Sequence, residues 1–291
     1  MNEKKRLGFI GAGNMAEALA RGLVENKVFK PSELIASDVD PVRRRRFKSA
    51  LKIEVTKDNL EVLNSSRAVL FAVKPQTIDA VLSELARAGG EGSGTPAKGA
   101  KRPRTNALAT KLFVSIAAGV TLGRLEAALG ARARVIRVMP NAPAMVGQGM
   151  AALVRGHKAT RADEAFALKL FRAVGDAVAL KDEALLDAVT ALSGSGPAYV
   201  YLFAKSLADA GVAQGLPADL ALRMALKTIR GAEENMRRSP MAAAELIRIV
   251  ASPGGTTEAA LKQLGADGFS DIVARAIHAA AERSRELGRT S

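Results

Sequence analysis

The sequence predicts an α/β domain with a parallel sheet, followed by an all-helical domain. Short apolar segments alternate with helical patterns through residues 1–160, which is typical of a parallel sheet covered by helices on both faces. From about residue 160 the apolar residues recur only with the helical period. A glycine-rich turn joins the first strand to the first helix, as in dinucleotide-binding sheets. We therefore divide the 291 residues into a first domain, 1–160, and a second domain, 161–291.

Five buried strands are expected in the first domain, with helices between them. The predicted strands are RLGFI (6–10), ELIAS (33–37), RAVLFAV (67–73), KLFVSIAAG (111–119) and ARVIRVMP (133–140). The helical patterns include IDAVLSELARA (78–88) and LGRLEAALG (122–130). The segment AGGEGSGTPAKGAKRPRTN (88–106) interrupts the alternation with five Gly and four Lys or Arg, which predicts a flexible, solvated basic loop.

The second domain is expected to consist of helices throughout. Thr160 and Asp163 have the spacing of a capping box, and Gly175 is expected to close the helix that they begin. No strand-like alternation is found after residue 160.

The composition excludes several classes of function. The net charge of +14 attracts nucleotides and small acids as well as nucleic acid, but with no Trp and two Tyr, stacking on single strands is disfavoured. The absence of Cys excludes disulfides, thiolate nucleophiles and cysteine-ligated metals. No apolar run approaches the about 18 residues of a membrane span, and MNEKKR leaves no room for a signal peptide. We expect a cytoplasmic protein without metal, membrane or nucleic-acid partner.

The turn GFIGAGNMA indicates dinucleotide binding. Gly11 and Gly13 permit a tight turn and a close approach to a pyrophosphate, while Ala16 keeps the helix near the strand. The helix then presents free N–H groups to the phosphates. The motif is weak alone, but here it follows the first strand and begins a helix, which is the context that it requires.

The end of the second strand bears on the choice of cofactor. Ser37 and Asp38 lie about 20 residues past the glycine turn, where an acidic group accepts hydrogen bonds from a ribose hydroxyl and favours NADH. Four arginines follow at 43–46, and one of them could instead hold the 2′-phosphate of NADPH, although most of the run is expected to face solvent. We expect both cofactors to bind, with a slight preference for NADH.

The two histidines, His157 and His278, lie in contexts that suggest no proton relay. Reduction of a carbonyl usually needs a strong acid–base group, whereas an imine nitrogen is basic enough to arrive protonated. The sequence therefore favours imine reduction, in which the enzyme mainly positions its substrate. Two segments, ALSGSGPAYVYLF (191–203) and SPGGTT (252–257), place small residues and hydroxyls before helices. Each is either an anion site at a helix N-terminus or an ordinary helix cap.

Together these motifs resemble the pyrroline-5-carboxylate reductases, from about residue 7 to residue 287. The resemblance is carried by GFIGAGNMAEAL, FAVKPQ (71–76), VSIAAGVTLGRLEAALG (114–130), VIRVMPNAPAMVGQGM (135–150), LSGSGPAYVYLF (192–203) and SPGGTTEAAL (252–261). It implies a Rossmann domain, a helical dimerisation domain, and reduction of 1-pyrroline-5-carboxylate to L-proline with NADPH or NADH. It also implies dimers that assemble into a larger ring such as a decamer.

The resemblance assigns roles to individual residues. The implied cofactor contacts, in addition to Ser37 and Asp38 at the end of the second strand, are Gly11, Gly13, Asn14 and Met15 at the pyrophosphate, Asn59 at the adenosine half, and Ala72, Val73, Lys74, Pro75, Met139, Pro140 and Asn141 along the remainder. The implied substrate contacts are Ser252, Gly254, Gly255, Thr256 and Thr257, with Ser195 and Tyr199 as further polar positions. Thr257 is the catalytic candidate, because its hydroxyl would lie beside the ring nitrogen, either donating a proton or orienting the ring.

Two features depart from the family pattern. The 88–106 segment is longer and more basic than usual, and Asp38 replaces a small hydroxyl residue suited to NADPH. Two other functions are compatible with parts of the sequence. A β-hydroxyacid dehydrogenase would carry a catalytic lysine one turn past Gly196, where this chain has its nearest lysine only at Lys205. A non-catalytic nucleotide-binding protein would bind cofactor without turnover.

Overall fold

The computed structural model describes residues 5–89 and 108–290, so most of the predicted basic loop at 88–106 lies outside the described residues. The chain divides into two compact units. The first contains the described residues up to Gly194 together with those from Ala281 onward, and the second is Ser195–Ala280.

The first unit is built on one sheet of eight strands. They are β1 (Lys5–Ile10), β2 (Leu34–Ser37), β3 (Glu54–Thr56), β4 (Ser66–Phe71), β5 (Leu112–Ser115), β6 (Arg134–Met139), β7 (Gly149–Arg155) and β8 (Gly175–Ala179). Their order is β3-β2-β1-β4-β5-β6-β7-β8, with β1 to β6 parallel and β7 antiparallel to β6. This is the strand order of a Rossmann fold, and the order reverses between β1 and β4.

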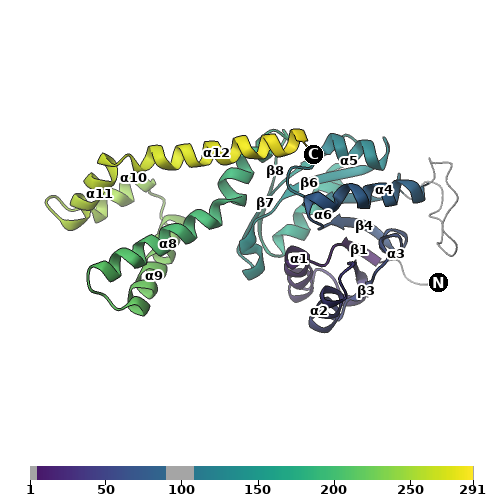
Figure 1. The fold of residues 1–291 in the computed structure, drawn as a ribbon, viewed down its shortest axis with the longest axis horizontal. Helices are drawn as coiled ribbons and strands as arrows, with labels where there is room; N and C mark the ends of the chain where they lie inside the picture. Colours follow the sequence, from purple (N-terminus) through teal and green to yellow (C-terminus); the bar gives the residue numbers. More distant parts are fainter. Residues whose placement is uncertain (1–4, 90–107, 291) are drawn as a thin grey trace. The chain divides into compact units, whose positions relative to one another are not determined.

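Helices cover both faces of this sheet (Figure 1). On one face lie α1 (Asn14–Glu25), α2 (Pro41–Leu51) and α6 (Arg161–Arg172); on the other lie α3 (Asn59–Ser65), α4 (Ile78–Gly89), α5 (Leu122–Leu129) and the short α7 (Leu185–Val189). Phe9 packs edge-on against Phe47 in the first layer, and Phe71 stacks on Phe113 at 5.6 Å in the second. All four side chains are fully buried, so each contributes about 1.5–3 kcal/mol through burial alone.

The prediction that no strand follows residue 160 is wrong. The capping box is present, because Thr160 Oγ1 accepts from Asp163 N–H and Asp163 accepts from Thr160 N–H, but the helix ends at Arg172. Gly175 begins β8 instead of closing the helix; its φ is +153°, and an added Cβ would lie 1.9 Å from Gly149 O. Only Ala177 of β8 is buried, so this edge strand lacks the apolar alternation by which a strand is recognised. Since α6 and β8 pack with the sheet, the first unit extends past the predicted boundary at residue 160 to Gly194.

The second unit consists of helices and has almost no core of its own. They are α8 (Gly196–Ala213), α9 (Ala218–Arg238), α10 (Ala243–Val250), α11 (Thr256–Ala266) and α12 (Phe269–Thr290), the last of which continues into the first unit. Of the residues Ser195–Ala280, all described, the only buried ones are Ala204, Ala208, Ala221 and Ala225. Large apolar side chains are exposed instead, including Leu202, Ile249 and Val250 at 65% each. Among the described helices, none has both the length and the apolar character needed to cross a membrane.

Candidate active site

The loops after β1 and β4 meet where the strand order reverses. Gly11, directly after β1, has φ +100°, and an added Cβ would lie 2.7 Å from the carbonyl carbon of Ala72 and 3.0 Å from Val73 N. Only glycine therefore lets the two loops pack together at this point. The structure thus brings the glycine turn beside the predicted residues Ala72 and Val73, which Lys74 and Pro75 follow, at the edge where Rossmann sheets bind their ligands.

Gly13 leaves space at the N-terminus of α1. It is the N-cap residue, it supplies no capping side chain, and no described atom lies within 4 Å of a Cβ added to it. Asn14 and Met15 follow in the first turn, whose N–H groups have no intrahelical partner. An uncapped helix end beside open space fits a pyrophosphate, because free N–H groups and the helix dipole favour an anion there.

A chain of hydrogen bonds joins the end of β2 to α3 and α4 at this edge. Ser37 is fully buried and its Oγ donates to Asn59 Oδ1 at 2.7 Å. Asn59 Nδ2 in turn donates to Glu84 Oε2 at 2.7 Å. The predicted pair Ser37 and Asn59 is thus brought together, and the end of β2 is tied to α3 and α4.

Asp38 is buried and supports the glycine turn. Its Oδ2 accepts from Ala12 N–H and its Oδ1 from Asp40 N–H, both at 2.9 Å. Arg43 Nη1 lies 3.7 Å from Asp38 Oδ2, and Arg44 Nη1 donates to Asp38 O. The carboxylate therefore holds the β1 loop while remaining beside a half-exposed arginine.

The arginine run is more engaged than a solvated helix face would be. Arg43 and Arg44 contact the loop after β2, and Arg46 Nε lies 2.7 Å from Glu17 Oε2 on α1. Their side chains nonetheless stay accessible, at 49% for Arg43 and 61% for Arg46. A cationic edge therefore borders the Asp38 turn.

The loop after β6 carries Met139, Pro140 and Asn141. Asn141 Nδ2 donates to both the carbonyl and the hydroxyl oxygen of Ser193 at 3.2 Å, and its Oδ1 accepts from Met150 N–H at 2.8 Å. This loop lies at the same sheet edge as the loops after β1 and β4, because all three strands are parallel. The nicotinamide half of a dinucleotide lies over this half of a Rossmann sheet.

Sequence reasoning missed the loop after β5. The predicted strand 111–119 ends at Ser115, and Ile116 N–H donates to Phe71 O while the chain turns through Gly119, whose φ is +75°. Because β5 lies between β4 and β6, residues 116–121 lie between the two predicted nicotinamide-side loops. Gly119 within the apolar run was the available signal that the strand ends earlier.

The second unit holds the substrate candidates of the SPGGTT segment at the start of α11. Gly254 has φ +72°, a left-handed conformation that favours glycine, and a Cβ added to Gly255 would lie 3.0 Å from the carbonyl oxygen of Ser252, so a small residue is favoured there as well. Gly255 is the N-cap and has no side chain to satisfy the first N–H groups, which belong to Thr256 and Thr257. Glu258 Oε2 accepts from Gly254 N–H at 2.6 Å. The turn thus presents backbone donors and two hydroxyls at a helix end.

Ser195 and Tyr199 lie apart from that turn in the hydrogen-bond network. Ser195 is the N-cap of α8, its carbonyl accepts from Ala198 N–H, and Tyr199 follows in the first turn, half-buried. Within the described residues, no hydrogen bond joins either side chain to residues 252–257. The structure therefore groups Ser252, Gly254, Gly255, Thr256 and Thr257, and leaves Ser195 and Tyr199 as a separate pair.

The comparisons with known proteins agree with this arrangement. Residues 183–287 match the family model described as pyrroline-5-carboxylate reductase dimerisation, and residues 6–92 match that described as NADP oxidoreductase coenzyme F420-dependent. A pyrroline-5-carboxylate reductase of Synechocystis sp. is 40% identical over 98% of each chain, and that of Pisum sativum is 40% identical over 99% of this chain and 97% of its own. The chain belongs to the pyrroline-5-carboxylate reductase family.

Solved structures extend the comparison to the fold. The pyrroline-5-carboxylate reductase of Coxiella burnetii superposes with a TM-score of 0.85 at 30% identity, covering 98% of each chain. The Plasmodium falciparum pyrroline carboxylate reductase, solved with NADP bound, gives 0.83 at 30% identity over 99% of this chain and all of its own. This reductase is therefore an NAD(P)H-dependent oxidoreductase, and its residues 183–287 form a dimerisation domain through which it self-associates.

Within the first unit, His157 lies away from the cofactor loops. His157 follows β7, which is antiparallel to β6, so it lies at the opposite edge of the sheet. Its Nδ1 is 2.8 Å from Glu126 Oε2 and its side chain is 88% exposed. His278 lies within α12 in the second unit. No group of three or more His, Cys, Asp and Glu suited to a metal occurs among residues 5–89 and 108–290.

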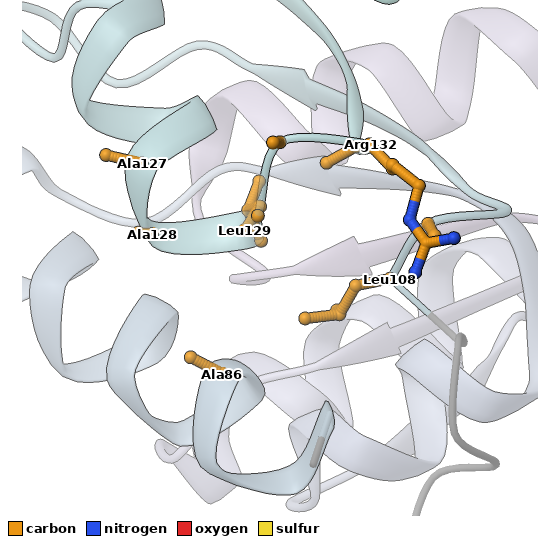
Figure 2. A pocket seen from close by; sticks show the side chains of 10 residues that line it. Ala86, Leu108, Ala127, Ala128, Leu129 and Arg132 are labelled. Atoms are coloured by element: carbon orange, nitrogen blue, oxygen red, sulfur yellow. The ribbon is translucent and has the colours of Figure 1, made fainter. Parts of the chain in front are cut away.

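A hollow in the first unit lies away from the cofactor loops. It has a volume of about 200 Å³ and is lined by Ala86, Leu108, Ala127, Ala128, Leu129 and Arg132, among others (Figure 2). Ala86 and Leu129 lie near the C-terminal ends of α4 and α5, which places the hollow at the edge opposite the cofactor loops. We therefore assign it no part in cofactor binding.

Proposed function

We propose that this chain reduces 1-pyrroline-5-carboxylate to L-proline, the last step of proline biosynthesis, with Thr257 as its catalytic residue. The observation that carries the residue assignment is the start of α11, where Gly254 takes a left-handed conformation and Gly255 leaves the first backbone N–H groups without a capping side chain. The substrate is a small ring with one carboxylate and one imine nitrogen. A helix end with free N–H groups and adjacent hydroxyls matches both groups.

In this proposal, different groups of the SPGGTT turn bind the carboxylate and the imine nitrogen of the substrate. The backbone N–H groups of Thr256 and Thr257, with Ser252, Gly254 and Gly255, bind the carboxylate, because the helix dipole favours an anion at that end. Thr257 is half-buried, and its hydroxyl lies beside the imine nitrogen. Since the protonated imine already attracts a hydride, orientation and one hydrogen bond are sufficient chemistry. Ser195 and Tyr199 are proposed as further substrate contacts.

The first unit holds the cofactor. Gly11, Gly13, Asn14 and Met15 bind the pyrophosphate; Ser37, Asp38 and Asn59 border the adenosine ribose; Ala72, Val73, Lys74, Pro75, Met139, Pro140 and Asn141 border the nicotinamide side. When bound, NAD(P)H supplies the hydride that reduces the C=N bond. The open end of α1 at Gly13 supports this assignment.

The cofactor preference depends on two opposite charges. The buried Asp38 carboxylate repels a 2′-phosphate and favours NADH, whereas Arg43, 3.7 Å away and half-exposed, attracts it. We propose that both cofactors are used, with a slight preference for NADH. Both Asp38 oxygens already accept backbone N–H bonds, which leaves each with one lone pair for the ribose.

Self-association is proposed to proceed from dimers to a larger ring such as a decamer. The second unit exposes large apolar residues and buries only four alanines. This supports burial of its apolar surface against a second copy of the chain. A cytoplasmic location stays a prediction.

The direct test mixes the purified protein with pyrroline-5-carboxylate and either NADH or NADPH, and follows loss of cofactor absorbance together with formation of proline. We expect proline with both cofactors and a slightly higher kcat/KM for NADH. Absence of proline with both would refute the proposed function, and a marked preference for NADPH would remove Asp38 from the ribose site.

A further inference from the structure

The side-chain amide of Asn141 forms its hydrogen bonds with other residues of the protein. Asn141 is the N-cap of the 3₁₀ helix Ala142–Val146, yet its side chain does not cap that helix. It bridges two distant segments instead, donating twice to Ser193, 52 residues away, and accepting from Met150 N–H, 9 residues away. Asparagine is among the preferred capping residues, so the local interaction is given up for a long-range one.

Met139 contacts the same distant segment from the other end of the loop. A Cβ added to Gly194 would lie 2.4 Å from Met139 Cε, so the methionine packs directly on that glycine. The loop 139–141 is therefore held at both ends by neighbouring residues, Ser193 and Gly194. The residue between them, Pro140, has no backbone N–H to add a further bond.

The partner segment has an unusual backbone. Residues Thr190–Gly194 form a π-helix, and Thr190 Oγ1 donates to Leu186 O at 2.7 Å. Single π-helical turns are rare and are often found at functional sites. This turn overlaps the motif LSGSGPAYVYLF (192–203), of which the proposed function uses only Ser195 and Tyr199. The backbone irregularity thus coincides with the contacts that Ser193 and Gly194 make with the loop after β6.

We propose that Asn141 is a positioning residue: with the π-helical turn 190–194 as its anchor, it sets where the loop 139–141 supports the nicotinamide. The inference rests on the proposed function, since that function gives the loop its cofactor. The loop borders the nicotinamide, and the side chain of Asn141 acts on hydride transfer by positioning that loop. Ser193 and Gly194 are then determinants of rate through their contacts with this loop.

The test compares Asn141→Asp with Asn26→Asp. The first change keeps size and the acceptor for Met150 N–H but places an oxygen against the Ser193 carbonyl. Asn26 is a matched control, because its Nδ2 also donates to two oxygens, Gly22 O at 3.1 Å and Ala173 O at 2.9 Å, at the opposite end of α1. Gly194→Ala provides a second, uncharged route to the same loop by displacing Met139.

For Asn141→Asp we expect kcat to fall about 10- to 100-fold, since misplacement by about 1 Å costs that much. The Kd of NADH, measured by fluorescence titration, stays within about twofold, because the pyrophosphate and ribose loops are unchanged. The isotope effect with cofactor deuterated at both C4 positions increases as hydride transfer becomes slower. Gly194→Ala gives the same pattern, and Asn26→Asp keeps the wild-type kcat and isotope effect.

Backbone hydrogen exchange separates this inference from the proposed function. Amides of residues 144–150 exchange faster in Asn141→Asp than in the wild type, whether or not the reaction is the one proposed. A wild-type protein that makes no proline overturns the proposed function and leaves exchange to decide the anchor. An unchanged kcat and unchanged exchange overturn the positioning role. A weakened Kd with unchanged isotope effect also overturns it, since Asn141 would then bind the cofactor directly.

Discussion

The two units of this reductase bury their apolar residues in opposite ways. The first encloses large side chains on both faces of its sheet, with Phe9, Phe47, Phe71 and Phe113 fully buried. In the second, only four alanines are buried while large apolar side chains face solvent. The first unit therefore encodes its own core, whereas the second is composed for burial against another surface. An exposed apolar area of this kind is typical of an interface rather than of an isolated surface.

The largest effect is expected from a charge on the exposed apolar surface of the second unit. Ile249 is 65% exposed, and its burial in a dimer is worth about 1.5–3 kcal/mol per copy. Ile249→Glu should therefore raise the dimer dissociation constant by about 10²-fold or more, because each dimer contains two copies. Light scattering after gel filtration measures the mass. Arg248→Glu, on the same helix but without loss of apolar area, is the control; dissociation of both variants alike would attribute the effect to charge alone.

The next largest effect tests whether the first unit is stabilised by its own core. Phe47 is fully buried against Phe9, so Phe47→Ala should cost about 3–5 kcal/mol of unfolding free energy. Denaturant titration, followed through the unfolding transition of the first unit, measures this loss of unfolding free energy. Its size should not depend on protein concentration, whereas the loss in Ile249→Glu should. A concentration-dependent loss in both would mean that the first unit also depends on association.

Thr257 tests the chemistry assigned to the second unit. Thr257→Ala removes a half-buried hydroxyl at the second position of α11 and leaves the backbone donors of the turn in place. We expect kcat to fall about 10- to 1,000-fold, the scale of one positioned polar group, with KM for pyrroline-5-carboxylate changed less. Steady-state kinetics measure both constants. Thr256→Ala is the matched control, and an equal loss of kcat in it would remove the special role of Thr257.

Asp38 offers a smaller test in the first unit. Asp38→Ser removes the charge but leaves one oxygen, which can accept from only one of Ala12 and Asp40 N–H at best geometry. The ratio of kcat/KM for NADPH to that for NADH should rise about tenfold, the effect of about 1.4 kcal/mol of charge repulsion. Asp40→Ser, at the adjacent turn position, controls for the loss of any carboxylate there. An unchanged ratio in Asp38→Ser would show that Asp38 serves the glycine turn alone.

Sequence patterns predicted the elements in which the residue types themselves reflect burial or capping. Strands β1, β2 and β4 are almost fully buried and were found from apolar runs, and the capping box of α6 from two residues three apart. The edge strand β8 was missed because one buried alanine leaves no pattern. The Asn141–Ser193 bridge could not be predicted either, because it joins residues 52 positions apart. It also depends on a π-helical turn that no spacing of residues in the sequence predicts. The residue roles at the candidate site remain predictions, which the variants above address.

The smallest effect concerns a carboxylate already present at the proposed anion site. Glu258 accepts from Gly254 N–H at 2.6 Å, so its charge lies at the helix end proposed for the substrate carboxylate. Glu258→Gln keeps an acceptor for Gly254 and removes the competing charge, which is worth about 0.3–1 kcal/mol at a helix end. KM for pyrroline-5-carboxylate should fall about two- to fivefold at low salt, with kcat unchanged, and less at high salt.

Glu245→Gln is the control for this change, since Glu245 accepts from Ala242 N–H at the start of α10 in the same way. It should leave KM unaltered, because no substrate is assigned to that helix end. A rise in KM for Glu258→Gln would reverse the interpretation: the carboxylate would then be needed to hold Gly254 in its left-handed conformation, and the cost of a looser turn would exceed the gain from removing a like charge. The sign of this small change therefore decides whether the SPGGTT turn is built by its glycines alone or also by the acid that follows them.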